Sequence, residues 1–461
     1  MAIELESVTK RYGRHLVVNG VDLRIEAGTS VVLTGPNGAG KSTLLNLIAG
    51  LTSLTSGKVT LAEKSRGDGI RGRGQVLGVL SHAGMLYDRL SGRENLQLHA
   101  RIRGLPAVRV DSVLAQVDML DAAERPVRTY SHGMRKRLSL ARLLLHEPAV
   151  LVLDEPFSGL DAASQERLSH VLGSLRGRHT IIFSTHDPAR AHAHADRVLT
   201  LDSGRIVDDR ATGGIVRAHR PTVAATLGQV SATRRSSAAS FVIATLEMLR
   251  KDVLIEARGR SASTAMLMLA GLLAVVLAMA FEPLATDPAV LSGALWVLIT
   301  FAVMHGLARS FDAEFHDDAL KGLLLSGADP AALYLGKVLS TALFLVAVAL
   351  ASIGLIAVFF SAPALIGALP GLLVLVGLAA VGLTAVGGLV SVMARHASLG
   401  ETLLPLLFLP LVVPVLLAGV ASVPVLLETG TLDPGWLRVL VAFDVGMLVA
   451  TTVFFEHLWE G

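Results

Sequence analysis

A glycine-rich loop near the amino terminus carries the clearest chemistry in this sequence. The loop runs from Gly35 to Thr43, directly after an apolar segment and into a helical one. Its glycines let backbone N–H groups converge on phosphate oxygens, and the start of the helix adds a favourable dipole. We expect Lys41 to reach the β- and γ-phosphates of a bound nucleotide and Ser42 to hold Mg²⁺. The expected phosphate-binding residues are Gly35, Pro36, Asn37, Gly38, Ala39, Gly40, Lys41, Ser42 and Thr43.

Two adjacent carboxylates follow an apolar segment further along the chain. Residues 150–153 are Val-Leu-Val-Leu, and Asp154 and Glu155 come directly after them. We expect Asp154 to position Mg²⁺ and Glu155 to polarise the water that attacks the nucleotide. The alternative, a strand that ends in a surface acidic turn, is disfavoured by the phosphate loop in the same chain.

Alternating strands and helices are expected to position these residues. Short apolar runs over residues 2–33 are broken by glycines, which is typical of strands joined by tight turns. Further strands are expected at 31–34, 150–153, 180–184 and 198–201, and helices at 41–49 and 134–146. This alternation indicates an α/β domain with a parallel sheet.

Composition divides the chain into two parts. Its 461 residues are 52% hydrophobic, which is too apolar for an ordinary soluble protein. From Thr264 to the end there are five Lys or Arg against thirteen Asp or Glu, so the remainder holds 36 basic and 25 acidic residues. A basic first part suits an anionic membrane surface and a polyphosphate ligand, and we favour that reading over nucleic acid. The absence of cysteine excludes disulfides and thiolate metal sites.

The second part contains apolar stretches about as long as the ~20 residues needed to cross a membrane. The stretches are 264–281, 290–308, 338–360, 369–392, 402–420 and 438–455. Residues 241–260 alternate apolar and charged residues, which predicts an amphipathic helix on the membrane surface. The amino terminus lacks the apolar core of a secretory signal, so the first part is expected in the cytosol. Basic residues then gather in the cytosolic loops, at Arg309, Lys321, Lys337 and Arg395.

The first part resembles the ATPases of ABC transporters, because further motifs of that family follow in order. They are Tyr12, the loop from Ser131 to Arg135, the loop from Ser158 to Asp161, and His186. The resemblance implies that Tyr12 stacks on adenine and that His186 contacts the γ-phosphate beside Lys41 and Glu155. It also implies a head-to-tail dimer, in which Ser131 and Gly133 cap the nucleotide of the opposite subunit and Asp161 lies at the seam. Because one ATPase is fused to one membrane half, we expect a homodimer, and a heteromer with an unfused ATPase is the alternative.

This family has a parallel-sheet core, an antiparallel β subdomain and a helical subdomain, and the same fold is expected here before an all-α membrane domain of about six helices. Two positions depart from the family pattern. His82 stands where the family has a glutamine that senses Mg²⁺ and faces the membrane domain, so His82 is a further metal and nucleotide candidate with its own pH dependence. His132 stands in the signature loop where a glycine is usual.

The second part resembles CcmB, the membrane subunit of the haem exporter-like system of cytochrome c maturation, whose partner ATPase is CcmA. The matching features are Leu249 to Asp252, Arg309 to Phe311, Gly322 to Leu325, Leu335 to Lys337 and the proline-rich run from Leu404 to Pro414. The resemblance implies two further partners, a haem-handling membrane protein and a periplasmic haem chaperone. Haem is a possible ligand, although no tryptophan-rich segment is present.

These observations predict an ATP-binding domain over 1–215, a linker over 216–240 and a transmembrane domain over 241–461 in the bacterial cytoplasmic membrane. The leading hypothesis is an ATPase that exports haem or releases a haem-loaded chaperone. A general exporter of a drug, lipid or polysaccharide precursor is the alternative. Soluble ABC proteins that act on ribosomes or DNA are disfavoured by the apolar spans. The charged segment after Arg309, which includes Glu314, Asp317 and Asp318, is expected either to meet the basic ATPase surface or to remain solvated.

Two groups of residues carry smaller expectations. Pro405, Pro410 and Pro414 favour a kink in one span, which is either a moving gate or, as we prefer, a fixed bend relieved by neighbouring helices. His192 and His194 are expected to begin a solvated helix, in preference to a metal site.

Overall fold

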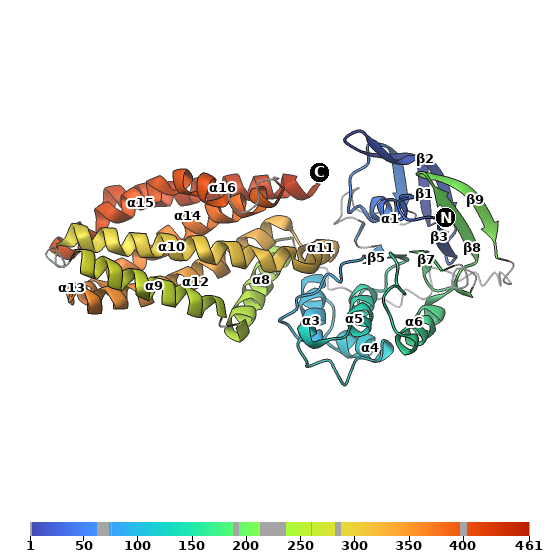
Figure 1. Ribbon diagram of the computed structural model, residues 1–461, viewed down its shortest axis with the longest axis horizontal. Helices are drawn as coiled ribbons and strands as arrows, with labels where there is room; N and C mark the ends of the chain where they lie inside the picture. Colours follow the sequence, from blue (N-terminus) through green and yellow to red (C-terminus); the bar gives the residue numbers. More distant parts are fainter. Residues whose placement is uncertain are drawn as a thin grey trace. The chain divides into compact units, whose positions relative to one another are not determined.

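The computed structural model describes residues 2–61, 73–74, 76–187, 193–212, 237–259, 261–281, 287–396 and 403–460. They form two compact units (Figure 1). The first unit consists mainly of Met1–Ile243 together with His316–Asp329, a segment that comes from the second part of the sequence. The second unit consists of Ala244–Phe315 and Pro330–Trp459. Most of the expected linker, residues 216–236, lies outside the described residues.

A six-stranded sheet forms the centre of the first unit, in the order β5-β6-β7-β3-β8-β9. The strands are β3 (Ser30–Thr34), β5 (Leu77–Leu80), β6 (Val150–Leu153), β7 (Thr180–Ser184), β8 (Arg197–Asp202) and β9 (Arg205–Ala211). All neighbouring pairs are parallel except β8 and β9. The central strands are apolar and buried along their length, as expected for a parallel sheet covered on both faces. The predicted parallel core is therefore confirmed, with one antiparallel edge strand added.

A second sheet has the order β2-β1-β4 and is antiparallel throughout. Its strands are β1 (Ile3–Tyr12), β2 (His15–Ile25) and β4 (Ser56–Leu61). Ile3, Leu5 and Val8 of β1 are buried, whereas Glu6 and Ser7 between them are exposed. This is the antiparallel β subdomain that the family resemblance implied.

Helices of the first unit pack on the large sheet or on one another (Figure 1). They are α1 (Lys41–Ala49), α3 (Gly92–Arg103), α4 (Val108–Gln116), α5 (His132–Leu144) and α6 (Ala162–Leu175), with a short 3-10 turn at Val127–Thr129. Side chains fix where three of them begin: Ser91 caps α3, Ser131 caps α5 and Asp161 caps α6.

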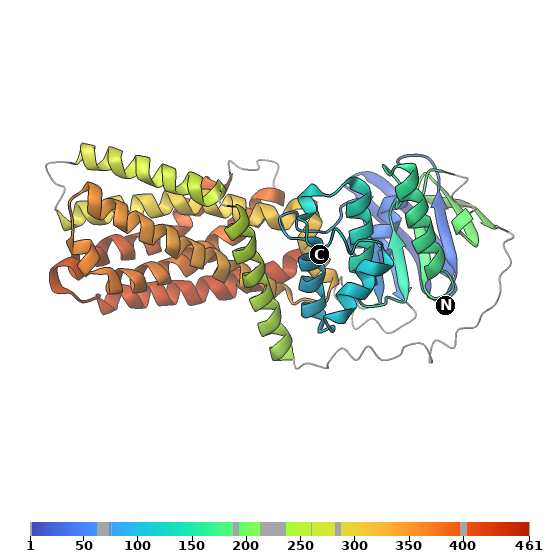
Figure 2. The same ribbon diagram turned by 90° about the horizontal axis from the view of Figure 1, so that it is seen from below.

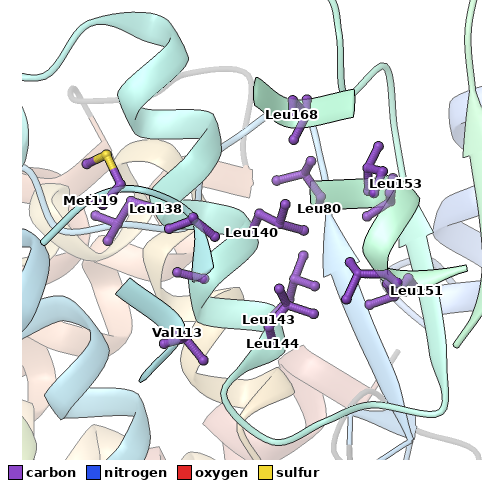
Figure 3. Close-up of a cluster of buried hydrophobic side chains, with 14 of the residues drawn as sticks. Leu80, Val113, Met119, Leu138, Leu140, Leu143, Leu144, Leu151, Leu153 and Leu168 are labelled. Atoms are coloured by element: carbon purple, nitrogen blue, oxygen red, sulfur yellow. The ribbon is translucent and has the colours of Figure 1, made fainter. Parts of the chain in front are cut away.

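The apolar face of α5 anchors the helical part to the sheet (Figure 3). One contiguous buried cluster includes Leu140 and Leu144 of α5, Leu80 of β5 and Leu153 of β6, and it extends to Val113 of α4. Burial of a leucine side chain contributes about 1.5–3 kcal/mol. This packing fixes the start of α5 relative to the sheet, and with it the loop that contains Ser131.

Long apolar helices make up the second unit and run alongside one another (Figure 1, Figure 2). They are α9 (Ser261–Ala280), α10 (Pro288–Phe315), α12 (Pro330–Phe359), α14 (Leu369–His396), α15 (Leu403–Thr429) and α16 (Pro434–Glu460), with a short α13 (Ala364–Gly367). They are preceded by α8 (Ser237–Gly259). Over the described residues, the last four long helices are long and apolar enough to cross a membrane, and Leu267–Ala280 and Pro288–Met304 are shorter apolar helices.

The proline-rich span is a continuous helix. Pro410 and Pro414 lie inside α15, as does Pro424. Pro405 lies in the first turn of α15, where its missing N–H is tolerated.

Candidate functional site

The glycine-rich loop connects β3 to α1 with a backbone that only glycine accommodates. Gly35 has a φ of 137°, and a Cβ added there would lie 2.0 Å from the carbonyl oxygen of Leu201. Gly40 has a φ of 99°, and its Cβ would lie 2.6 Å from the carbonyl oxygen of Val17. The loop is therefore held close to two neighbouring backbones, with room for no side chain at either glycine.

Lys41 begins α1 and is 7% exposed. Its ammonium donates to the carbonyl oxygens of Gly35 and Pro36 at 2.8 and 2.9 Å. The positive charge is thus held inside the curve of the loop, at the amino-terminal end of a helix. A helix start and a cation combined in this way favour the binding of an anion.

The two carboxylates after β6 share one serine. Ser184, the last residue of β7, donates from its hydroxyl to Asp154 Oδ1 at 2.7 Å and accepts from the backbone N–H of Glu155 at 2.8 Å. Glu155 adopts a φ of 47°, an uncommon value for a residue with a side chain. Ser184 therefore links the predicted metal ligand to the backbone of the predicted base, and sequence reasoning did not identify it.

Glu155 and His186 lie in direct contact. His186 Nδ1 and Glu155 Oε2 are 2.8 Å apart, and both side chains reach solvent. Lys136 of α5 donates to the Glu155 carbonyl at 2.9 Å, and burial lowers the pKa of this ammonium. His186 therefore orients the Glu155 carboxylate, while Lys136 and Ser184 hold the Glu155 backbone.

Sheet order brings these groups to one edge. The strands β6, β7 and β3 are adjacent and parallel, so their carboxyl ends meet. The phosphate loop, the pair Asp154 and Glu155, and His186 each follow one of these ends. A ligand site at the carboxyl ends of parallel strands is the common arrangement in α/β domains.

Tyr12 and His82 lie on the surface of the first unit. Tyr12 ends β1, is 49% exposed, and has Lys10 Nζ 5.0 Å from its ring centroid. An exposed ring with one free face can stack on a base. His82 is exposed in the loop after β5. Of the HxH pair, His192 lies outside the described residues and the His194 ring stacks on Phe157 at 5.4 Å.

Gly133 and Asp161 lie around Ser164, and Ser131 caps α5 two residues before Gly133. Asp161 accepts from the Ser164 N–H at 2.7 Å, and these hydrogen bonds lower the pKa of the Asp161 carboxyl. A Cβ on Gly133 would lie 2.6 Å from the Ser164 hydroxyl. The signature loop and the loop ending at Asp161 are therefore packed against each other.

The segment that comes from the second part of the sequence docks against this unit. It comprises a 3-10 turn, η3 (His316–Asp318), and α11 (Ala319–Leu325). Asp317 Oδ1 accepts from the N–H of Gly84 at 2.7 Å, and the Asp317 carbonyl accepts from the N–H of Met85 at 2.9 Å. Burial raises the pKa of the Asp317 carboxyl. The loop that contains His82 therefore receives the docked segment.

A buried histidine fixes the other end of the docked segment. The ring Nδ1 of His99 lies 2.6 Å from the Ser326 hydroxyl, and Arg103 donates to the Leu325 carbonyl at 2.6 Å. His99 is 1% exposed, and burial lowers its pKa well below the usual value, as do the charges of Arg142 and Arg103. Its Nε2 has no hydrogen-bond partner among the described residues.

Asp88 connects the docked segment to the signature helix. Its Oδ1 accepts from Arg135 of α5 at 2.6 Å, and its Oδ2 lies 3.4 Å from His316 Nε2. Arg135 is two residues beyond Gly133. One carboxylate thus contacts both the docked segment and the first turns of the helix that carries the signature loop.

The second unit holds a buried charge cluster, defined by Lys251, Asp252, Glu314 and Lys337. Lys251 bonds to Glu314 and lies 2.9 Å from Asp252, whereas Lys337 lies 2.9 Å from Glu314 and 3.1 Å from Asp252. Ser340 donates to Asp252 at 2.6 Å. Burial raises the pKa of Asp252, but the two ammonium groups outweigh this effect and hold the pKa below its usual range. Of the acidic residues expected to meet the ATPase surface, Glu314 pairs within this cluster instead.

Comparison with known proteins gives matches to both parts. The family model described as ABC transporter matches residues 18–158, and the model described as CcmB protein matches residues 243–457. The daunorubicin resistance ATP-binding protein DrrA3 of Streptomyces coeruleorubidus is 37% identical over 214 residues, which cover 45% of this chain and 67% of that protein. The maltose/maltodextrin import ATP-binding protein MalK of Escherichia coli K12 is 37% identical over 214 residues, and the chain spans 57% of its length.

Among solved structures, the dimeric ATP-binding cassette MJ0796 bound to ADP and Pi is 26% identical, with a TM-score of 0.42, and the match covers 46% of this chain and 99% of that chain. The motif order, the sheet and the sequence matches agree. This chain belongs to the ABC transporter family and joins an ATP-hydrolysing ABC domain to a CcmB membrane domain.

Proposed function

We propose that this chain is one half of an ATP-driven membrane machine of the haem exporter and cytochrome c maturation type. The observation that carries the proposal is the CcmB match over residues 243–457 in a chain that begins with an ABC ATPase. ATP turnover would move the membrane helices and either export haem or release a haem-loaded periplasmic chaperone. A haem-handling membrane protein is the expected partner.

In the proposed chemistry, Glu155 polarises the attacking water and His186, its hydrogen-bond partner, keeps the carboxylate oriented toward the γ-phosphate. Lys41 stabilises negative charge on the phosphates. The Ser42 hydroxyl and the Asp154 carboxylate offer the oxygen donors that Mg²⁺ prefers, and the ion would neutralise charge on the β- and γ-phosphates. His82 is a further candidate for contact with this ion through water.

The site requires two copies in this proposal. Ser131, at the start of α5, and the pair Gly133 and Asp161 beside Ser164 would close over the nucleotide bound by the opposite subunit. A homodimer supplies both halves, because one ATPase is fused to one membrane domain. We place the ATPase in the cytosol and the apolar helices in the bacterial cytoplasmic membrane.

The docked segment would couple hydrolysis to movement. It lies between α10 and α12 in the chain. A displacement of Gly84 or Met85 would therefore be passed to the end of α10 or to the start of α12. The link through Asp88 to Arg135 would make the same segment sensitive to the position of the signature helix.

The test is genetic complementation in the native host after deletion of the gene. We expect the deletion to abolish covalent haem attachment to c-type cytochromes, read by haem staining of membrane fractions. The wild-type gene and a Glu166→Gln variant, altered at an exposed position of α6, should restore it. A Glu155→Gln variant should not. Normal holo-cytochrome c in the deletion strain would contradict the proposal.

A second candidate is a general exporter of a drug, lipid or polysaccharide precursor. The name of DrrA3, which is a drug-resistance protein, favours it. Purification from native membranes separates the two candidates. A bound haem-handling protein or haem absorbance supports the first, and increased drug sensitivity of the deletion strain with unchanged cytochromes supports the second.

A further inference from the structure

An acidic side chain lies in the middle of α16. Asp444 comes ten residues after Pro434 and eleven before Phe455, the ends of the membrane-length helix. Its side chain is 5% exposed. Since a helix of about 20 residues crosses the hydrocarbon core, Asp444 lies near the centre of a span.

The Asp444 carboxyl packs against the backbone of Gly382, and no charged group lies beside it among the described residues. Neither of its oxygens has a hydrogen-bond partner among the described residues. Oδ1 rests on the backbone of Gly382 in α14, where an added Cβ would lie 2.4 Å away, and the Phe443 ring covers the same glycine. Because Gly382 has no side chain, there is room beside it for the Asp444 carboxyl.

Among the described residues, no cationic side chain that could neutralise an ionised Asp444 lies within the apolar stretches. The apolar stretches contain no Lys, Arg or His; these are residues 267–280, 288–304, 338–359, 369–394, 406–427 and 439–455. Arg438 is six residues earlier on the same helix, about 240° around its axis.

An unpaired carboxylate away from water is costly, by several kcal/mol or more, and such a group takes up a proton instead of remaining ionised. We propose that Asp444 is a proton-binding site in the middle of the membrane domain. In the arrangement seen here it is a neutral carboxylic acid. When movement of the helix admits water, the proton passes to that water and the carboxylate remains.

The position of Asp444 suits such a movement. Only 17% of the apolar stretch of α16 is buried within the unit, whereas 67% of the apolar stretch of α14 is buried. A shift of α16 therefore breaks less packing than a shift of α14 would. The proton site is independent of the transported substrate, so it goes beyond the function proposed above.

The test uses the full-length protein in lipid vesicles and dicyclohexylcarbodiimide, an apolar reagent that reacts with protonated carboxyls. Adduct formation is located by mass spectrometry of peptides between pH 5 and 9. We expect Asp444 to be labelled at pH 7.5 and the Asp444→Asn variant to lose that adduct. The matched control is Glu428→Gln, at the exposed end of α15, which should leave labelling of Asp444 unchanged.

A second measurement separates this site from a simple structural role. Asparagine has the shape of a neutral aspartic acid, so Asp444→Asn should retain the melting temperature of the wild type, whereas a carboxylate paired with a partner's cation would lose stability on the same change. Absence of an adduct at pH 7.5, or labelling that disappears above pH 5 as for an exposed aspartate, would overturn the proposal. A large fall in melting temperature with Asp444→Asn would do the same.

Discussion

At the scale of single residues, Ser184 is the functional side chain that the fold reveals. Its hydroxyl holds both the Asp154 carboxylate and the Glu155 backbone. We expect Ser184→Ala to lower the rate of ATP hydrolysis about five- to twelvefold, since a lost hydrogen bond of about 1–1.5 kcal/mol corresponds to such a factor. Steady-state phosphate release from the purified protein measures it. Ser174→Ala, which removes an exposed hydroxyl on α6, is the control and should leave the rate unchanged.

Gly35 allows a second test at this scale. Gly35→Ala places a Cβ 2.0 Å from the Leu201 carbonyl oxygen at a φ of 137°. The loop must shift, so we expect loss of nucleotide binding, measured with a fluorescent ATP analogue. Gly173→Ala in α6 meets no atom within 4 Å, and it should retain binding and stabilise the helix by up to about 1 kcal/mol. Equal binding by both variants would show that the loop does not hold the nucleotide.

At the scale of elements, His99 makes docking of α11 sensitive to pH. Its folded pKa lies well below 6.5, the value of an exposed histidine. Between the folded pKa and 6.5, His99 binds more protons in the undocked state than in the docked state. The free energy that favours docking therefore rises with pH in this range. The contribution of neutral His99 to docking is complete above pH 6.5 and is lost as the pH falls below it, because a protonated ring would have an unpaired Nε2–H.

Hydrogen exchange over residues 319–326 measures this dependence. We expect protection to fall between pH 7.5 and pH 5.5 after correction for the intrinsic rate. His99→Gln, which keeps a polar group near Ser326 without the titration, should flatten the dependence. His170→Gln, an exposed position in α6, should keep it. An unchanged dependence in His99→Gln would remove this histidine from the explanation.

The buried charge cluster in the second unit should be sensitive to loss of one member. Glu314→Gln removes one of the two carboxylates that Lys251 and Lys337 contact in this cluster, and breaking a buried pair costs about 3–5 kcal/mol. We expect a fall of several degrees in the melting temperature of the detergent-solubilised protein. Asp318→Asn removes an exposed partner of Lys321 and should change stability by less than about 1 kcal/mol. Similar melting temperatures for both variants would argue against a structural role of the cluster.

These elements also show what the sequence could predict. The phosphate loop and the strand before Asp154 are contiguous, so local pattern and spacing identified them together with their strands and helices. The contact between Gly84 and Asp317 joins residues 233 positions apart, and that between Lys251 and Glu314 joins residues 63 apart. Such contacts depend on tertiary packing, which no local pattern encodes. Asp444 was missed for another reason, because a single acidic residue hardly changes the mean hydropathy of a span.

At the scale of the whole molecule, the proposed site is shared between two copies, and this can be tested with mixed dimers. Lys41→Ala removes the cation proposed to bind phosphate, and Ser131→Arg places a large charge at an exposed position of the signature loop. If each site combines the phosphate loop of one chain with the signature loop of the other, a dimer with the two changes on separate chains keeps one intact site. A dimer with both changes on one chain and a wild-type partner keeps none.

Two differently tagged chains, purified in sequence on both tags, give these mixed dimers. We expect the dimer with separated changes to hydrolyse ATP at up to half the wild-type rate if the two sites act independently, and at a lower but measurable rate if they cooperate. The dimer with both changes on one chain should be inactive. A site contained within one chain predicts the opposite, because the wild-type partner would then keep its own complete site. The order of these two rates therefore decides between a shared and a self-contained site without requiring knowledge of the transported substrate.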